Sequence, residues 1–428
     1  TYAVLIIVAT LALTHVAEYG ILSIQVNDNP TKWFERSHPI READRVLNSH
    51  FGGTYMAYLA LEPPTMSTSE YAEKLQDRVA EYRKGLESPP QGMEEVTEAL
   101  RQEIGSIARG GKEAGLTKSE LLDRVDSFVA GKIGSAPDDR KDAWRTARKA
   151  TDKALSEYQI FKHPEVLRYI GGLQQYLTTT GVVGKSNSLT DIVKTVHREL
   201  MAGAKPREEA FAVPDKQGAV AQCLMQFQNS HRPQDLWHFT TPDYHTGNIW
   251  LQLKSGDNKD MSKVVSAVDR YMEANPPPEE LSREWFGLTY INVVWQQKMV
   301  YGMLTAFLGS FLVVLLLMIL LFGSGIWGLL SMVPLTITIA LVYGTIGLIG
   351  KDYDMPVAVL SSLSLGLAVD YAIHFLARSR QMSLQYGSWA EAVKGVFGEP
   401  ARAISRNVIV AGTGFLPLLA APLVPYKT

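Results

Sequence analysis

The stretch PVAVLSSLSLGLAVDYAIHFLA, from Pro356 to Ala377, is apolar except at a few positions, and its one charged residue is Asp370. At a rise of about 1.5 Å per residue, a helix over this stretch can cross a hydrocarbon core of about 30 Å. A charged side chain in that core costs roughly 2.5–3.5 kcal/mol on insertion scales, so it faces a bundle interior or a water path. The stretch therefore predicts a membrane-spanning helix in which Asp370 handles an ion or a proton. A carboxylate that only joins helices is the alternative.

The residues around Asp370 support the first interpretation. Ser362, Gly366, Asp370 and His374 recur every four residues, so they share one helix face. The small residues Ser362 and Gly366 let a second helix approach closely. A carboxylate with a histidine one turn away and Tyr371 beside it can take, hold and pass a proton. We therefore predict a proton relay of Asp370, Tyr371 and His374, with Ser362 and Gly366 as helix-packing residues next to it.

Five apolar stretches predict a membrane bundle of α-helices, and the turns between the second, third and fourth are short. The link 378–406 is rich in Arg and Lys, which indicates the cytoplasmic side, and counting back places 23–297 outside. We expect a truncated first transmembrane helix over 1–22 and helices two to five over 298–428. The five stretches are Tyr2–Val16, Met299–Phe322, Ile326–Ile349, Pro356–Ala377 and Val408–Val424.

Composition and motifs exclude several classes of protein. The net charge is −2 and no strongly basic stretch points to nucleic acid. The single cysteine, Cys223, cannot form a disulfide within the chain. VVGKS (Val182–Ser186) lacks the first glycine of a phosphate-binding loop, which argues against ATP. His231, His238 and His245 recur every seven residues in a predicted loop and hairpin, where they do not converge, so we expect no metal and no cofactor.

The region 23–297 predicts an α+β domain. Thr54–Glu62 predicts a buried strand, Leu236–Thr241 and Asn248–Lys254 a hairpin, and Phe286–Ile291 a short strand that follows a helix. Strand–helix–strand units at both ends favour ferredoxin-like split βαβ packing.

A helix-rich insertion over about 65–160 separates these strands, and its charges of both signs are interspersed. We expect a solvated helical hairpin, because charged helix faces are usually just solvated. A docking surface for a partner protein is the alternative.

One span, a large outer domain and further spans follow one another in this chain, and the fourth span contains the sequence GLAVDYAIHFLARSR (Gly366–Arg380). In this order and in this sequence, the chain resembles one half of a resistance–nodulation–division (RND) transporter. The resemblance is strongest to the branch with the mycobacterial membrane protein large (MMPL) family and the hopanoid transporters. Phe397–Thr428 resembles that family's fifth span, and His163–Val196 resembles part of its outer domain. The resemblance covers nearly the whole chain, and a start within a span favours the C-terminal half.

The resemblance implies a function. In this family two six-span halves form a pseudo-symmetric unit, an acidic residue in the fourth span relays protons, and the outer domain is a porter domain that moves substrate. Carried over, Asp370 is the proton carrier and Tyr371 its partner. The implied protein is not an enzyme but a proton-driven exporter of hydrophobic or lipid-like molecules, of the hopanoid, sterol or lipid class. It would lie in the bacterial inner membrane with its large domain in the periplasm.

The implied partners are the membrane, the lipid substrate, the other half of the transporter and a periplasmic protein. Two departures from the family stand out: a sixth span is missing, and the insertion over 65–160 is longer than usual. The alternative function, from the same superfamily, is protein secretion or sterol sensing.

Overall fold

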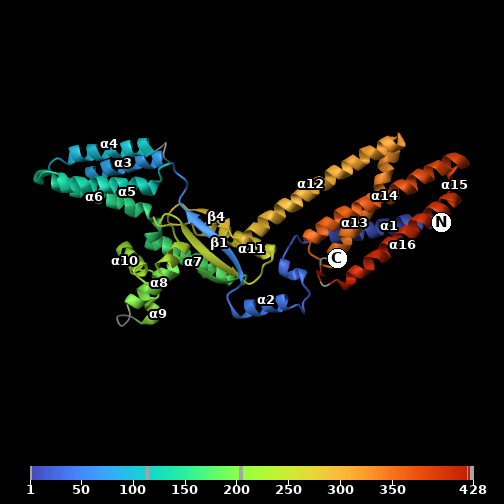
Figure 1. Ribbon diagram of the computed structural model, residues 1–428, viewed down its shortest axis with the longest axis horizontal. Coiled ribbons are helices and arrows are strands. Elements are labelled where there is room, and N and C mark those ends of the chain that lie inside the picture. The colour runs from blue at the N-terminus through green and yellow to red at the C-terminus, as the bar shows by residue number, and fades with distance from the viewer. Residues whose placement is uncertain (1, 112–114, 202–205, 422, 425–428) are drawn as a thin grey trace. The chain divides into compact units, whose positions relative to one another are not determined.

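The computed structural model describes residues 2–111, 115–201, 206–421 and 423–424. The chain divides into two compact units, whose helices and strands are labelled in Figure 1. The first unit comprises Thr1–Tyr55, Leu253–Val265 and Leu288–Thr428. The second comprises Met56–Gln252 and Ser266–Gly287.

Long apolar helices dominate the first unit. Four of its described segments are long and apolar enough to cross a membrane: Val4–Leu22, Leu288–Phe322, Gly325–Leu348 and Ala401–Ala420. The helices of this unit are α1 (Tyr2–Leu22), α2 (Pro39–His50), α12 (Leu288–Phe322), α13 (Gly325–Leu348), α14 (Met355–Tyr386), α15 (Trp389–Val396) and α16 (Glu399–Phe415), with short 3-10 helices at Pro30–Trp33 and Leu416–Ala420.

The helix ends differ from those predicted. Helix α1 continues to Leu22, beyond the predicted end at Val16. Helix α12 begins at Leu288, so the predicted strand Phe286–Ile291 is wrong over most of its length. Thr289, Val293 and Gln296 are buried there at spacings of four and three residues, which is a helical period and not a strand alternation. The fourth predicted span, Pro356–Ala377, lies within α14, and several of its side chains lie outside the described residues.

Helices α1 and α13 pack with their backbones in contact. A Cβ atom on Gly20 would overlap the carbonyl group of Gly344, and one on Gly347 would overlap the carbonyl group of Gly20. A Cβ atom on Gly344 would in turn overlap Ala17. Small residues at these positions therefore let the two helices approach closely, as is common between membrane helices.

The second unit contains a four-stranded sheet in the order β2-β3-β1-β4. Strands β1 and β4 are antiparallel, with Tyr58 opposite Phe286 and Glu62 opposite Ser282. Alternate residues of β1 and β3 are buried, so one face of each strand is covered. The strands are β1 (Tyr55–Glu62), β2 (Val183–Asn187), β3 (Gly247–Leu253) and β4 (Ser282–Phe286). The helices between them, apart from α3–α6, are α7 (Pro164–Thr179), α8 (Leu189–Leu200), α9 (Arg207–Ala210), α10 (Gln217–Gln228) and α11 (Asn258–Ala274).

The predicted hairpin is half wrong. Its second strand, Asn248–Lys254, corresponds to β3, but the first half of its first strand, Leu236–Thr241, lies in a 3-10 helix, Pro233–His238. Proline in the first turn favours a helical start, because its fixed φ suits a helix and its missing N–H is not needed there. The rest of the hairpin is partly kept: Thr240 forms an isolated antiparallel bridge with Gly247. The N–H of Thr241 donates to the carbonyl of Thr246 at 3.1 Å, and the N–H of Asn248 donates to the carbonyl of Phe239 at 2.9 Å.

The insertion is a four-helix bundle and not the hairpin that the sequence predicted. Figure 1 shows its helices side by side: α3 (Thr68–Lys84), α4 (Met93–Gly111), α5 (Lys118–Ser135) and α6 (Asp138–Tyr158). Capping boxes start two of them, Ser67 with Glu70 at α3 and Thr117 with Glu120 at α5. The bundle has a hydrophobic core of its own, which includes Leu100 and Leu121, and the described residues buried in it lie between Ala72 and Tyr158.

Candidate functional site

Asp370 lies midway along α14, as the sequence predicted for its stretch. The helix begins after Asp354, whose Oδ1 accepts a hydrogen bond from the backbone N–H of Val357 at 3.0 Å. Pro356 follows in the first turn, where it suits a helix start. The helix then runs without a break through Asp370 to Tyr386.

Packing against α13 indicates the depth of Asp370 in the bundle. Ala368 and Val369, directly before it, pack on a small core around Met332 and Leu335 of α13. Those two residues lie near the middle of a segment that is long and apolar enough to cross a membrane. The carboxylate therefore lies at the level of the central part of α13 and far from either end of α14.

The carboxylate and the imidazole form a pair. His374 Nε2 lies 3.4 Å from Asp370 Oδ1, one helical turn away. Both side chains are open: 72% of His374 and 65% of Asp370 is exposed in the described chain. Tyr371, beside Asp370, is half-buried. At this separation a proton can move between the two groups through one bridging water molecule.

A hollow of about 440 Å³ contains this pair. Helix α14 lines it with Asp370, Tyr371, His374 and Arg378, and α16 lines it with Ala403, Ile404 and Asn407. The structure therefore brings all three predicted relay residues to one place. Sequence reasoning missed Asn407, although an amide directly before the apolar run Val408–Val410 was a visible signal.

Of the two predicted packing residues, Ser362 and Gly366, the structure describes the surroundings of Gly366 alone, and its described atoms show no helix packed against that glycine. Gly366 lies in α14 with no described atom within 4 Å of an added Cβ, and it is exposed. The side chain of Ser362 lies outside the described residues. Among the residues that the structure describes, no three His, Cys, Asp or Glu side chains gather as a metal site.

Exposure of a charge at this depth has a physical consequence. A carboxylate that faced lipid would meet a medium in which ions are strongly disfavoured, so such groups are covered by protein or by water. The open side of the Asp370–His374 pair must therefore be covered by further protein or a water path when the helices lie in a membrane.

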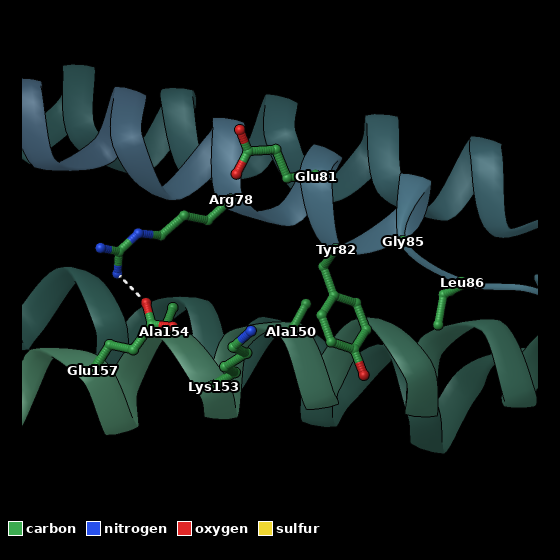
Figure 2. Close-up of a pocket in the computed structure, with 9 residues that line it drawn as sticks. All are labelled: Arg78, Glu81, Tyr82, Gly85, Leu86, Ala150, Lys153, Ala154 and Glu157. Atoms are coloured by element: carbon green, nitrogen blue, oxygen red, sulfur yellow. Dashed lines mark ion pairs between the residues drawn. The ribbon is translucent and has the colours of Figure 1, made fainter.

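A separate hollow of about 700 Å³ lies in the bundle, between α3 and α6. Figure 2 shows Arg78 paired with Glu157 across it and Tyr82 pointing from α3 toward α6. The distance from Arg78 Nη1 to Glu157 Oε2 is 2.5 Å. Its lining mixes both signs of charge with Tyr82 and Leu86, so it indicates no single ligand chemistry.

Comparison with known proteins supports the assignment of this chain as a membrane protein. A protein of Methanocaldococcus jannaschii that is named as a membrane protein is 24% identical over 168 residues, which are 39% of this chain and 43% of that protein. The chain thus spans less than half of the length of that relative. A serine/threonine-protein kinase of Mycosarcoma maydis is 25% identical over 120 residues, 28% of this chain and 18% of the kinase, a share too small to bear on the site.

The sequence profile of the MMPL family matches residues 177–428, more than half of the chain. The matched part contains α12, α13, α14 and α16 and therefore the whole Asp370 site. With its apolar helices, its small sheet and this match, the chain belongs to the MMPL family of membrane proteins.

Proposed function

We propose that the chain is part of a transporter that uses the proton gradient to export hydrophobic or lipid-like molecules, with Asp370 as the proton carrier. One observation carries the proposal: Asp370 and His374 are paired at 3.4 Å at the depth of the middle of α13. Ionisable residues within a membrane are costly and therefore rare, and where they occur they commonly belong to proton relays or ion pathways.

The mechanism follows from the chemistry of the pair. Protonation of Asp370 removes a negative charge from the hollow that it shares with α16. The neutral acid packs against another helix more readily than the carboxylate does, so proton binding shifts the helices between two arrangements. Tyr371 and His374 would pass the proton to and from the carboxylate. The other half of the transporter would cover the open side of the pair.

The second unit would be the porter domain on the periplasmic side of the bacterial inner membrane. Its sheet order, β2-β3-β1-β4, with helices between β1 and β2 and between β3 and β4, supports a split βαβ layout. The four-helix bundle, which has its own core, would then be an addition to the porter domain that suits a periplasmic partner protein. Hopanoids, sterols or other lipids are the substrate class that we propose.

The test is export by the full-length protein with Asp370→Asn, in proteoliposomes with an imposed proton gradient. We expect loss of gradient-driven export at equal membrane insertion and equal substrate binding. Glu391→Gln is the matched control, because Glu391 is an exposed carboxylate on α15 outside the hollow. Unchanged export by the Asp370 variant would leave that residue as a helix-packing group and would refute the proton mechanism.

A further inference from the structure

Buried polar side chains gather where α1, α11, α12 and α14 begin or end, a cluster that we name the polar junction. Its members all belong to the first unit and are less than one-tenth exposed. Such a concentration of buried amides and carboxylates is unusual, because polar groups that leave water must be paired. The members are Asn27, Asp28, Asn29, Asp257, Asn258, Gln296 and Asp354.

Asn27 connects two helix starts through one side chain. Its Nδ2 donates a hydrogen bond to Oδ2 of Asp352 at 2.7 Å, in the turn before α14. Its Oδ1 accepts the backbone N–H of Asn258, the first residue of α11, at 2.9 Å. Asn27 itself is 2% exposed and its bond to Asn258 is buried, so water does not compete for that bond, whereas Asp352 is half-buried.

Asp257 provides a second connection to the same segment. Asn29 Nδ2 donates to its Oδ1 at 2.8 Å, and Lys32 Nζ donates to its Oδ2 at 2.5 Å. Burial raises the pKa of Asp257, but the hydrogen bonds from Lys32 and Asn29 outweigh burial, so the pKa lies below its ordinary value. Asp257, directly before α11, is therefore a carboxylate with both oxygens bound by residues of the segment that follows α1.

The turn before α14 is bound to the chain after α1 by its backbone as well. The N–H of Tyr353 donates to the carbonyl of Gln25 at 2.8 Å, and the N–H of Asn27 donates to the carbonyl of Tyr353 at 3.3 Å. Lys351 pairs at 2.6 Å with Asp354, the N-cap of α14. The start of α14 is thus held at several points, and the helix then continues without interruption to Asp370.

We propose that the polar junction passes displacement of α14 to α11, with Asn27 and Asp257 as its positioning residues. The inference rests on the proposed role of Asp370. Opening the junction would leave buried donors and acceptors unpaired, which is unfavourable, so the joined segments move together. Helix α11 begins at Asn258 in the first unit and its chain continues into the second unit at Ser266, so a displacement of its first turn reaches the second unit along the helix itself.

Hydrogen exchange on the full-length protein in lipid nanodiscs tests this connection. Asp370→Asn stands in for the protonated acid. As a single substitution, Asp370→Asn should change the hydrogen-exchange rate about twofold or more in peptides covering 26–32 and 258–265, as well as in peptides of α14. With Asn27→Ala added, the change at 258–265 should disappear while the change in α14 persists. A merely structural role for Asn27 would raise exchange equally with and without Asp370→Asn.

Two further variants keep the test decisive. Asp352→Ala removes the acceptor of the hydrogen bond from Asn27. Because Asp352 is only half-buried, this variant replaces Asn27→Ala if that protein does not fold. Lys259→Ala is the matched control, because its exposed contact with Gln25 lies beside the junction but outside it. The control should leave the change at 258–265 intact.

The outcomes separate this inference from the proposed function. If Asp370→Asn abolishes export and alters α14 but leaves 258–265 unchanged, the connection is refuted while the proton mechanism stands. If Asp370→Asn changes neither export nor exchange, both are refuted. Loss of the change at 258–265 in the Asn27 or Asp352 variants, but not in the Lys259 variant, supports the connection.

Discussion

Gly20 of α1 and Gly344 of α13 meet backbone to backbone, because a side chain on either would overlap the other helix. In a bilayer the hydrophobic effect does not drive two apolar helices together, so close packing of small residues has to do so. Helix α13 also packs against α14, whose Val369 lies on the Met332–Leu335 core next to Asp370. The glycine contact therefore holds α1 on the helix that supports the candidate site.

Gly20→Val should separate α1 from α13. The added side chain would overlap the Gly344 carbonyl, and overpacking of this kind costs about 1–3 kcal/mol or more when backbone must move. We expect a lower thermal unfolding temperature in detergent. Gly302→Val is the control, since no described atom lies within 4 Å of a Cβ there. Equal destabilisation by both variants would contradict close α1–α13 packing.

Leu121→Ala should destabilise the four-helix bundle. Leu121 is fully buried in the bundle core, and truncation of a buried leucine costs about 2–5 kcal/mol. Because this core is separate, hydrogen exchange should rise in α3–α6 and stay unchanged in α12–α14. Lys141→Ala, which breaks an exposed ion pair with Asp138, should change stability by less than about 0.5 kcal/mol. Increased exchange throughout the protein would show that the bundle does not unfold separately.

Asp28 should make stability depend on pH. Burial raises the pKa of Asp28, and so does the nearby carboxylate of Asp354. A hydrogen bond from Trp33 and the charge of Lys351 lower the pKa, but the net shift is upward. A raised pKa means that the folded state binds the proton more tightly, so the free energy of unfolding rises as pH falls toward the ordinary value of 3.8 and falls as pH rises. Asp28→Asn keeps an acceptor for Trp33 and removes the charge.

The variant Asp28→Asn should therefore be more stable than the parent at pH 7, and the difference should shrink toward pH 4. Thermal unfolding of both proteins across this range measures it. Parallel curves, with a constant difference between the two proteins, would mean that Asp28 does not titrate differently on unfolding.

His374→Gln should slow gradient-driven export. If the imidazole exchanges a proton with Asp370 at 3.4 Å, its loss should lower the rate on the order of 10²-fold, as loss of a positioned acid or base does. Substrate binding should stay the same. His231→Gln, in an exposed loop of the second unit, is the control. An export rate that is unchanged in both variants would remove His374 from the relay.

Several features of the fold could be predicted because their signals are local. The apolar stretches predicted the long helices, and β1 and β3 agree with predicted strands. The strand predicted at Phe286–Ile291 failed because its apolar residues also fit the first turns of α12. The helical hairpin became a four-helix bundle because apolar positions on α3–α6 needed one another for burial, which charge content alone does not reveal.

By itself, the sequence determined that this chain has apolar helices long enough to cross a membrane. It also determined that one long helix, α14, carries Asp370 and His374 one turn apart. In a bilayer every backbone polar group must be paired, and an α-helix does so within its own segment, so a long apolar stretch predicts a helix. The tertiary structure decided that Asn407 of α16 shares the hollow of Asp370, that α1 docks on α13, and that Asn27 joins Asp352 to Asn258. Each of these contacts connects residues far apart in the chain, and steric fit and hydrogen bonding between such residues leave no periodic signal in the sequence.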